Sequence, residues 1–287
     1  MIGTRQNPMD QKHLVFSLCD SADEYRRLGE YAKAEPLYQR ALESAESLFG
    51  ANHVRVSIIC NNFAVLYKYT GKFDRAEQLY RRALTTMEQT LGPEHPDVAA
   101  IYHNLGGLEH ARGRYTVAEP LARRSVEITG KMVNDEDVTL ATHIAALAAI
   151  LDGQGKYDES EPLYLRTLAI FRRAYGEEHY EVAVNLNNLA ALYYSRREHD
   201  RAEPLYRQAL ALKEKLLSPS HPDTAMTLNN LAVLLKAQGK LNESAPFYQR
   251  ALAVFRSALK PDHPNLIRCR KNYESLLKIL VLRETPC

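Results

Sequence analysis

The segment Ala202-Glu203-Pro204-Leu205-Tyr206 decides the fold, because close copies of it return every 42 residues along the chain. A fixed period in this range is typical of repeat proteins, in which each unit packs mainly on its neighbours. The chain is therefore predicted to be a solenoid, whose long surface favours recognition of a partner over catalysis. The other copies begin at Ala34, Ala76, Ala118, Ser160 and Ser244.

One repeat predicts two helices joined by a tight turn. Proline is favoured at the first helical position, so the stretch 92–97, Gly-Pro-Glu-His-Pro-Asp, predicts a helix over about 97–112. Gly113 ends that helix, and a second helix is expected from near Thr116 to about Lys131. Capping-box spacing supports the start of the second helix. The pairs with this spacing are Thr116 and Glu119, Asp74 and Glu77, Asp158 and Glu161, and Asp200 and Glu203.

The period also predicts the organisation of the whole chain. A flexible N-terminus is expected over residues 1–10, a capping helix over 263–282 and a tail over 283–287. Terminal helices of a repeat stack must hide its apolar end, which is why the last helix is interpreted as a cap. Between these ends lie six predicted units, 11–52, 53–94, 95–136, 137–178, 179–220 and 221–262.

The spacing inside each unit resembles the tetratricopeptide repeat. In the second unit, Phe63-Ala64, Tyr67, Ala76, Tyr80 and Ala83 lie where that pattern places Leu-Gly, Tyr, Ala, Phe and Ala. The unit is longer than the ordinary repeat of about 34 residues. Its length and three recurring segments resemble the repeats of kinesin light chain and its bacterial relatives. The segments are Leu-Asn-Asn-Leu-Ala (186–190, 228–232), Gln-Gly-Lys (154–156, 238–240) and Ala-Glu-Pro-Leu-Tyr.

The resemblance implies an all-α fold, a right-handed superhelical solenoid of antiparallel helix pairs with six tetratricopeptide-type repeats and a C-terminal capping helix. It also implies a protein-binding module with an adaptor or scaffold role. Kinesin light chains carry a coiled coil before their repeats, whereas ten residues precede the first predicted helix here. We therefore expect a free-standing binding module rather than a motor-bound adaptor.

Helical geometry separates the core side of each first helix from its open side. When Phe63 and its equivalents are numbered position 7, positions 4, 7, 8 and 11 share one face at about 100° per residue. Cys60 at position 4 is accordingly interpreted as a small buried residue. Positions 2, 6, 9 and 13 lie on the other side, which lines the concave groove in tetratricopeptide stacks.

The open positions predict a peptide-binding groove. Asparagine amides both donate and accept hydrogen bonds, so they can hold the main chain of an extended peptide. Apolar side chains on an exposed face mark interaction sites, and Lys68, Lys236 and Arg268 mildly favour an acidic ligand. The predicted peptide-binding residues are Asn62, Asn104, Asn188, Asn230, Ile58, Val65, Val184, Met226, Val233, Lys68 and Lys236.

A structural role for the asparagines is the alternative, because the same amides can bridge neighbouring helices and stabilise the stack. The fourth unit also breaks the pattern, since Ala146 replaces the asparagine. With this break, either the ligand binds to two separated groups of asparagines, or the central unit accepts an apolar side chain of the ligand. Two other functions remain open, a self-assembling scaffold that forms homo-oligomers and a regulatory subunit of a separate enzyme.

Other classes of function find little support in the sequence. No phosphate loop, nucleophile elbow or zinc-protease motif occurs, so no enzyme activity, catalytic residue or cofactor is expected. A net charge of +2 gives no case for nucleic acid, and no apolar run is long enough for a membrane span. Met1 to Asp10 lacks the apolar core of a signal peptide, so a cytoplasmic location is expected.

Histidines at the repeat starts do not predict a metal site. Equivalent residues of successive repeats are at least about 8–10 Å apart, whereas zinc ligands lie about 2 Å from the ion. We interpret these residues as turn residues that precede each helix. They are His53, His95, His179, His221 and His263.

Overall fold

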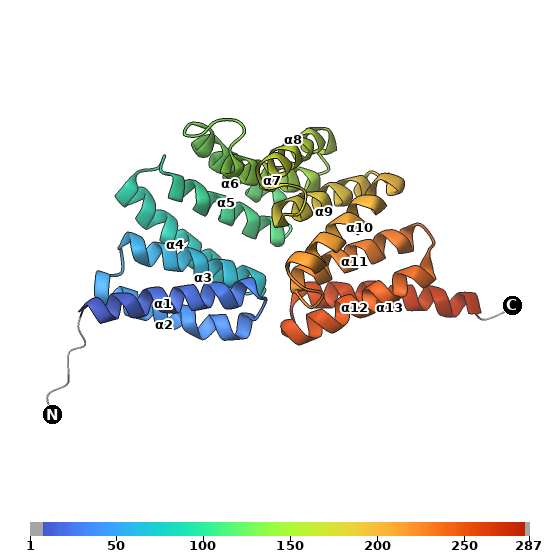
Figure 1. The fold of residues 1–287 in the computed structure, drawn as a ribbon, viewed down its shortest axis with the longest axis horizontal. Coiled ribbons are helices and arrows are strands. Elements are labelled where there is room, and N and C mark those ends of the chain that lie inside the picture. The colour runs from blue at the N-terminus through green and yellow to red at the C-terminus, as the bar shows by residue number, and fades with distance from the viewer. Residues whose placement is uncertain (1–7, 285–287) are drawn as a thin grey trace, which may run out of the picture. The chain divides into compact units, whose positions relative to one another are not determined.

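The computed structural model describes residues 8–284, and within this range the chain consists of thirteen α-helices without a β-strand (Figure 1). Residues 1–7 and 285–287, which include most of the predicted flexible N-terminus and tail, lie outside the described residues. The helices are α1 (Pro8–Arg27), α2 (Tyr31–Phe49), α3 (Val54–Tyr69), α4 (Phe73–Leu91), α5 (Pro96–Ala111), α6 (Tyr115–Gly130), α7 (Val138–Gly153), α8 (Tyr157–Tyr175), α9 (Tyr180–Ser195), α10 (His199–Leu216), α11 (Pro222–Ala237), α12 (Leu241–Ala258) and α13 (Pro264–Glu284).

The helices form two compact units, Met1–Val133 and Asn134–Cys287. In the first unit, α1 pairs with α2, α3 with α4 and α5 with α6, and each pair packs on the next. In the second unit, α7 pairs with α8, α9 with α10 and α11 with α12, while α13 packs on α12 and α11. The helix pairs predicted from the 42-residue period are confirmed within each unit.

Side chains cap the first helix of each pair from α3 onward. His95 Nδ1 accepts a hydrogen bond from the Asp97 backbone N–H at 3.2 Å, and Pro96 takes the first helical position as predicted. In the fourth repeat Asp137 Oδ1 accepts from the N–H groups of Thr139 and Leu140 at 2.7 and 3.3 Å. The interpretation of the histidines as residues that precede each helix is thus confirmed. His53, His179, His221 and His263 make the same bond at 3.0–3.3 Å.

This capping role predicts how substitutions at His95 affect stability. His95→Ala is expected to lower the free energy of unfolding by about 1 kcal/mol, because the Asp97 N–H loses its acceptor. His95→Asp is expected to keep most of that stability, since aspartate caps the fourth repeat in this way. Urea denaturation of both variants tests the assignment, and equal stability of His95→Ala and the parent chain would contradict it.

The prediction of capping boxes at the second helices is wrong. The residue before α4 is Lys72, which makes no side-chain capping bond, and Asp74 already lies inside the first turn. The backbone turn after α3 fixes the position of Lys72, because Gly71 has a φ of 72° and the Lys72 N–H donates to the Tyr67 carbonyl at 2.8 Å. The backbone of one helix end therefore sets the start of the next helix. The residues before α6, α8 and α10 likewise make no side-chain capping bond.

The tyrosines of the repeated segments build the core. The Tyr38 ring stacks on the Phe63 ring with centroids 5.4 Å apart. Cys60 is fully buried as predicted, and burial raises the pKa of its thiol to about 11. In the third repeat Ala122 replaces the tyrosine and lies against Gly106, where an added Cβ would meet the Ala122 nitrogen at 3.4 Å. Tyr38, Tyr80, Tyr164, Tyr206 and Tyr248 are all nearly inaccessible to solvent.

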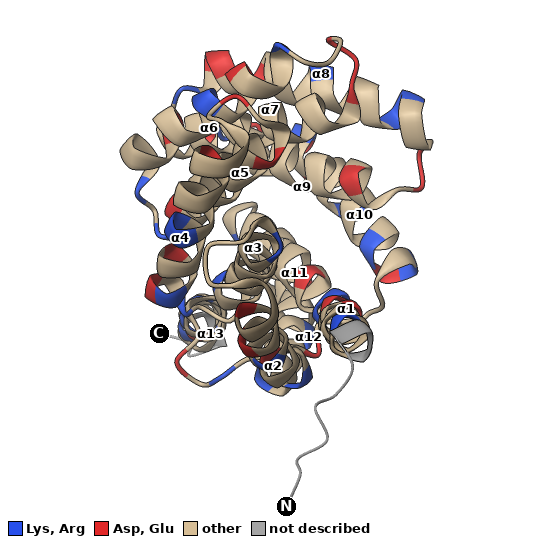
Figure 2. Cartoon of the chain, turned by 90° about the vertical axis from the view of Figure 1, so that its left-hand side faces the viewer, with Lys and Arg blue, Asp and Glu red and all other residues tan. Residues whose placement is uncertain are grey.

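The glutamate of the repeated segment joins neighbouring repeats instead of capping its own helix. Glu203 accepts from Lys240 of the next repeat at 2.7 Å, and Lys240 lowers the pKa of this carboxyl to about 2. Figure 2 shows both signs of charge on α4 rather than a patch of one sign. Equivalent ion pairs join Glu35 to Lys72, Glu77 to Arg112 and Glu161 to Arg196.

One core position of the third repeat holds a charge. Glu109 lies at position 11, where α3 and α11 place Tyr67 and Leu235, yet its side chain is only 3% exposed. Arg112 and Arg114 compensate this buried carboxylate, with Arg112 Nη1 lying 2.9 Å from Glu109 Oε1. The helical stripe places this residue in the core correctly but does not reveal its ionic partners.

Candidate functional site

The predicted open side of the first helices is accessible to solvent in both units. On α3, Ile58 is 45% exposed, while Asn62 and Val65 are half-buried and flank the buried Phe63. We call this side, positions 2, 6, 9 and 13 of each first helix, the asparagine face. In the first unit it includes Ile58, Asn62, Val65 and Asn104, and in the second Val184, Asn188, Met226, Asn230 and Val233, all at least partly accessible.

A chain of asparagine hydrogen bonds crosses the asparagine face of the second unit. Asn272 Nδ2 donates to Asn229 Oδ1 at 3.2 Å, and Asn229 Nδ2 donates to Asn230 Oδ1 at 3.5 Å. Asn230 Nδ2 then donates to Asn187 Oδ1 and Asn187 Nδ2 to Asn188 Oδ1, each at 3.3 Å. The amides thus link α13, α11 and α9 in series.

The first unit repeats this arrangement and ends it on a carboxylate. Asn104 Nδ2 donates to Asn61 Oδ1 at 2.9 Å, and Asn61 Nδ2 donates to Asn62 Oδ1 at 3.2 Å. Asn62 Nδ2 completes the series with a 3.4 Å contact to Asp23 Oδ2. Bridging between neighbouring helices, the structural alternative from the sequence, is therefore present in both units.

Asparagines at position 5 also belong to this series, or ladder, of hydrogen bonds, although the sequence pattern did not predict a role for them. Asn187 and Asn229 are buried, with exposures of 9% and 4%, whereas Asn188 and Asn230 beside them are partly accessible. The Asn-Asn dipeptides at 61–62, 187–188 and 229–230 are the sequence signal that could have revealed the pair. In the second unit, position 5 thus serves the stack alone, while position 6 also reaches solvent.

The accessible asparagines keep hydrogen-bonding capacity. A primary amide has two N–H donors and an oxygen with two lone pairs, and Asn230 uses one of each in the ladder. Asn188 accepts from Asn187, but its Nδ2 finds no asparagine on α7, because Ala145 holds position 5 there. Both residues therefore combine partial solvent access with unused donors and acceptors.

The predicted lysines lie beside the asparagine face, each within its own unit. Lys236 Nζ donates to Ser275 Oγ at 3.1 Å, which ties α11 to α13. Lys68 is half-buried and would lie 3.4 Å from a Cβ added at Gly107 on α5. Both ammonium groups therefore face the next first helix of their unit.

Asp152 is the unexpected charge near the asparagine face. It occupies the last turn of α7, at the position that Lys68 and Lys236 hold in their repeats. Burial raises the pKa of its carboxyl to about 6. Its Oδ1 is buried without a hydrogen-bond partner in the described part of the chain. No sequence pattern singled out this residue.

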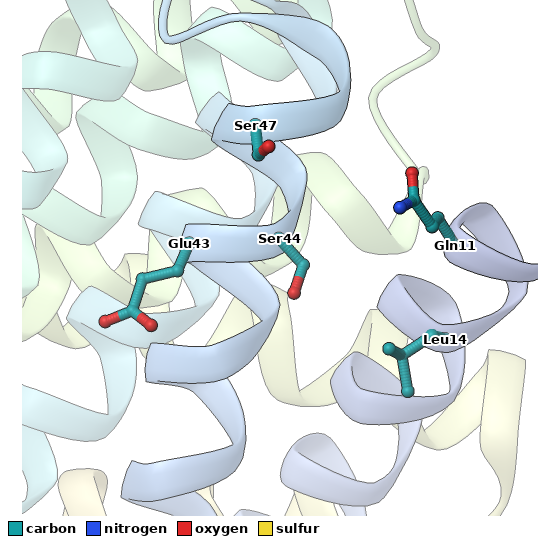
Figure 3. Close-up of a pocket in the computed structure, with 5 residues that line it drawn as sticks. All are labelled: Gln11, Leu14, Glu43, Ser44 and Ser47. Atoms are coloured by element: carbon teal, nitrogen blue, oxygen red, sulfur yellow. The ribbon is translucent and has the colours of Figure 1, made fainter. Parts of the chain in front are cut away.

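A pocket of about 300 Å³ lies elsewhere, between α1 and α2 (Figure 3). Gln11 and Leu14 come from α1, and Glu43, Ser44 and Ser47 come from α2. None of the predicted peptide-binding residues lines it. Its open, mixed lining shows no convergent catalytic group.

Residues 8–284 show neither a metal-binding cluster nor a membrane-spanning helix. No group of three or more His, Cys, Asp or Glu side chains in this range could hold a metal ion. None of the helices in this range is both long enough and apolar enough to cross a bilayer.

Comparisons with known proteins agree with the repeat geometry. A tetratricopeptide repeat model matches residues 18–89, 61–131 and 139–215, and a second such model matches 224–265. No curated protein matches the sequence. Tetratricopeptide repeats typically serve as protein–protein interaction modules without catalytic activity of their own.

Solved structures show the same fold. The structure of BtubC (BKLC) from P. vanneervenii is 30% identical, covers 88% of this chain and 94% of that one, and has a TM-score of 0.53. Kinesin light chain-like repeats from Podosopora anserina are 22% identical over 67% of this chain and 90% of that one, with a TM-score of 0.52. A Rap protein complexed with Competence and Sporulation Factor is 14% identical over 94% of this chain and 87% of that one, with a TM-score of 0.62. The chain belongs to the tetratricopeptide repeat family, and its structural neighbours include kinesin light chain-like repeats.

Proposed function

We propose that the chain binds an extended peptide segment of a partner protein along the asparagine face and acts as an adaptor or scaffold. The observation that carries this proposal is the difference between the two asparagine positions. In the second unit, only the position-6 amides, such as Asn188 and Asn230, combine solvent access with unused donors and acceptors. An extended main chain offers one N–H and one carbonyl per residue to such amides.

Apolar side chains beside the amides support the same proposal. Val184 and Met226 flank Asn188 and Asn230 within the second unit and are partly accessible. Contiguous exposed apolar patches that are rimmed by polar residues mark interaction sites. The amides would hold the peptide main chain, and the apolar positions would receive alternate side chains. The Rap neighbour was solved with a bound factor, which is in keeping with a binding role for this fold.

Paired alanine variants test the proposal against the structural alternative. The change Asn188→Ala with Asn230→Ala removes accessible amides, and Asn187→Ala with Asn229→Ala breaks the same ladder from its buried side. Each double variant is expected to lose roughly 1–3 kcal/mol of unfolding free energy, since both remove inter-helix hydrogen bonds. Only the first is expected to lose at least tenfold in affinity for a captured partner.

The measurement is affinity capture from native cell extract, followed by titration of the captured protein and by thermal unfolding of every variant. The buried-side variant controls for the ladder itself. If it loses capture as completely as the accessible-side variant, the asparagines act only through the stack. The peptide-binding proposal would then be wrong.

A further inference from the structure

The charges beside the asparagine face reverse sign once in the second unit. Position 12 of the first helices carries Asp152 on α7, then Tyr194 on α9 and Lys236 on α11. Lys278 follows at this position on α13, and Arg268 lies on the asparagine face of the same helix. One end of this unit therefore presents a carboxylate and the other end presents cations.

The carboxylate of Asp152 is unpaired among the residues that the structure describes. No side-chain hydrogen bond or ion pair reaches it from any described residue, and its Oδ1 is shielded from solvent. Asp152 interacts electrostatically with the buried phenols Tyr164 and Tyr206, which carry no positive charge. A buried charge normally has a partner, because desolvation without one is costly. The residue is still partly accessible, so a group from outside can reach it.

The surroundings of Asp152 suit a long side chain that ends in a cation. Ala149 and Ala145 lie three and seven residues earlier on α7, which places them on the same side of the helix. Both alanines are partly accessible, as is Ala191 on the neighbouring α9. The aliphatic stem of a lysine or arginine can pack along small apolar residues while its charged end reaches an acid.

The distance between the two charged ends sets the length of the segment. Packed helices lie about 8–10 Å apart, so two steps from α7 to α11 span about 20 Å. An extended chain covers about 3.3–3.6 Å per residue. About six residues therefore separate a group at Asp152 from a group at Lys236.

We propose that the second unit selects an extended peptide segment in which a lysine or arginine binds Asp152 and an acidic residue about six positions away binds Lys236. This inference rests on the proposed peptide-binding function. The partly buried carboxylate of Asp152, which has no described partner, is the reason to expect a basic residue, and the ammonium group of Lys236 is the reason to expect an acidic one.

The test is a selection from a random display library of twelve-residue peptides on the full chain. Wild-type protein is expected to enrich peptides with a basic and an acidic residue five to seven positions apart. Asp152→Asn is expected to lose the basic preference alone, and Lys236→Ala the acidic preference alone. Asp158→Asn serves as the matched control, because it removes one exposed carboxylate from α8 of the same repeat.

One enriched peptide, labelled with fluorescein, then gives the affinity by anisotropy. Replacing its basic residue by glutamine is expected to weaken binding to the wild type by at least tenfold and to leave binding to Asp152→Asn unchanged. Enrichment of peptides without a basic residue would overturn the assignment of Asp152. So would an equal loss of affinity for the wild type and for Asp152→Asn when the basic residue of the peptide is replaced. In that case, loss of every peptide by the Asn188→Ala, Asn230→Ala variant would still uphold the peptide-binding function. A wild-type selection that enriches nothing would overturn both proposals.

Discussion

Replacing Arg112 by methionine is expected to destabilise the first unit by about 3 kcal/mol, because it leaves buried Glu109 with one ionic partner. Arg112 is only 10% exposed and contacts Asp74 and Glu77 as well as Glu109. Arg114 is half exposed and retains contacts with both carboxylate oxygens of Glu109, so part of the compensation survives. Chemical denaturation gives the loss.

Rescue by a second substitution separates the buried charge from simple loss of packing. Glu109→Leu in the Arg112→Met background is expected to recover most of the lost stability, since Leu151 and Leu235 fill this position in other repeats. The matched control is Arg123→Met, which removes an exposed arginine paired with Glu119 on α6 and should cost less than about 1 kcal/mol. If Arg112→Met and Arg123→Met cost the same, Glu109 does not depend on Arg112.

Asp152→Asn is expected to stabilise the protein at pH 7.5 by about 1–2 kcal/mol. Burial raises the pKa of this carboxyl from 3.8 to about 6, so the folded state favours its protonated form. The full shift corresponds to about 3 kcal/mol, and partial exposure reduces that figure. The contribution of Asp152 to stability is present below pH 3.8 and is lost as the pH rises through about 6.

The pH profile of thermal unfolding checks this prediction. Between about pH 4 and 7, ionisation of Asp152 should destabilise the parent chain progressively, and the difference from Asp152→Asn should widen accordingly. Asp158→Asn, the exposed control, should follow the parent curve. A constant difference between Asp152→Asn and the parent over this window would show that the carboxyl does not titrate there. A residue that costs stability and carries a binding function is a recognised trade-off in proteins.

The repeat period predicted most of the fold because its physical causes are local. The spacing of Pro96, Gly113 and the apolar residues of each helix depends on neighbours a few positions away along the chain. The same local pattern placed the accessible side of the first helices at Ile58, Asn62 and their equivalents. The capping boxes failed because the Gly71 turn, rather than Asp74, satisfies the start of α4.

In the candidate site, too, the sequence determined the local features and the tertiary structure determined the contacts between helices. By itself, the sequence determined the helix pairs, the side of each first helix that faces solvent and the row of asparagines on it, since these follow from helical periodicity. Only the tertiary structure decided that Asn230 is bridged to Asn187, that Glu109 is compensated by two arginines and that Asp152 has no partner among residues 8–284. Each of these depends on which side chains of different helices or turns meet in space, and burial then determines how strongly their charges and amides interact.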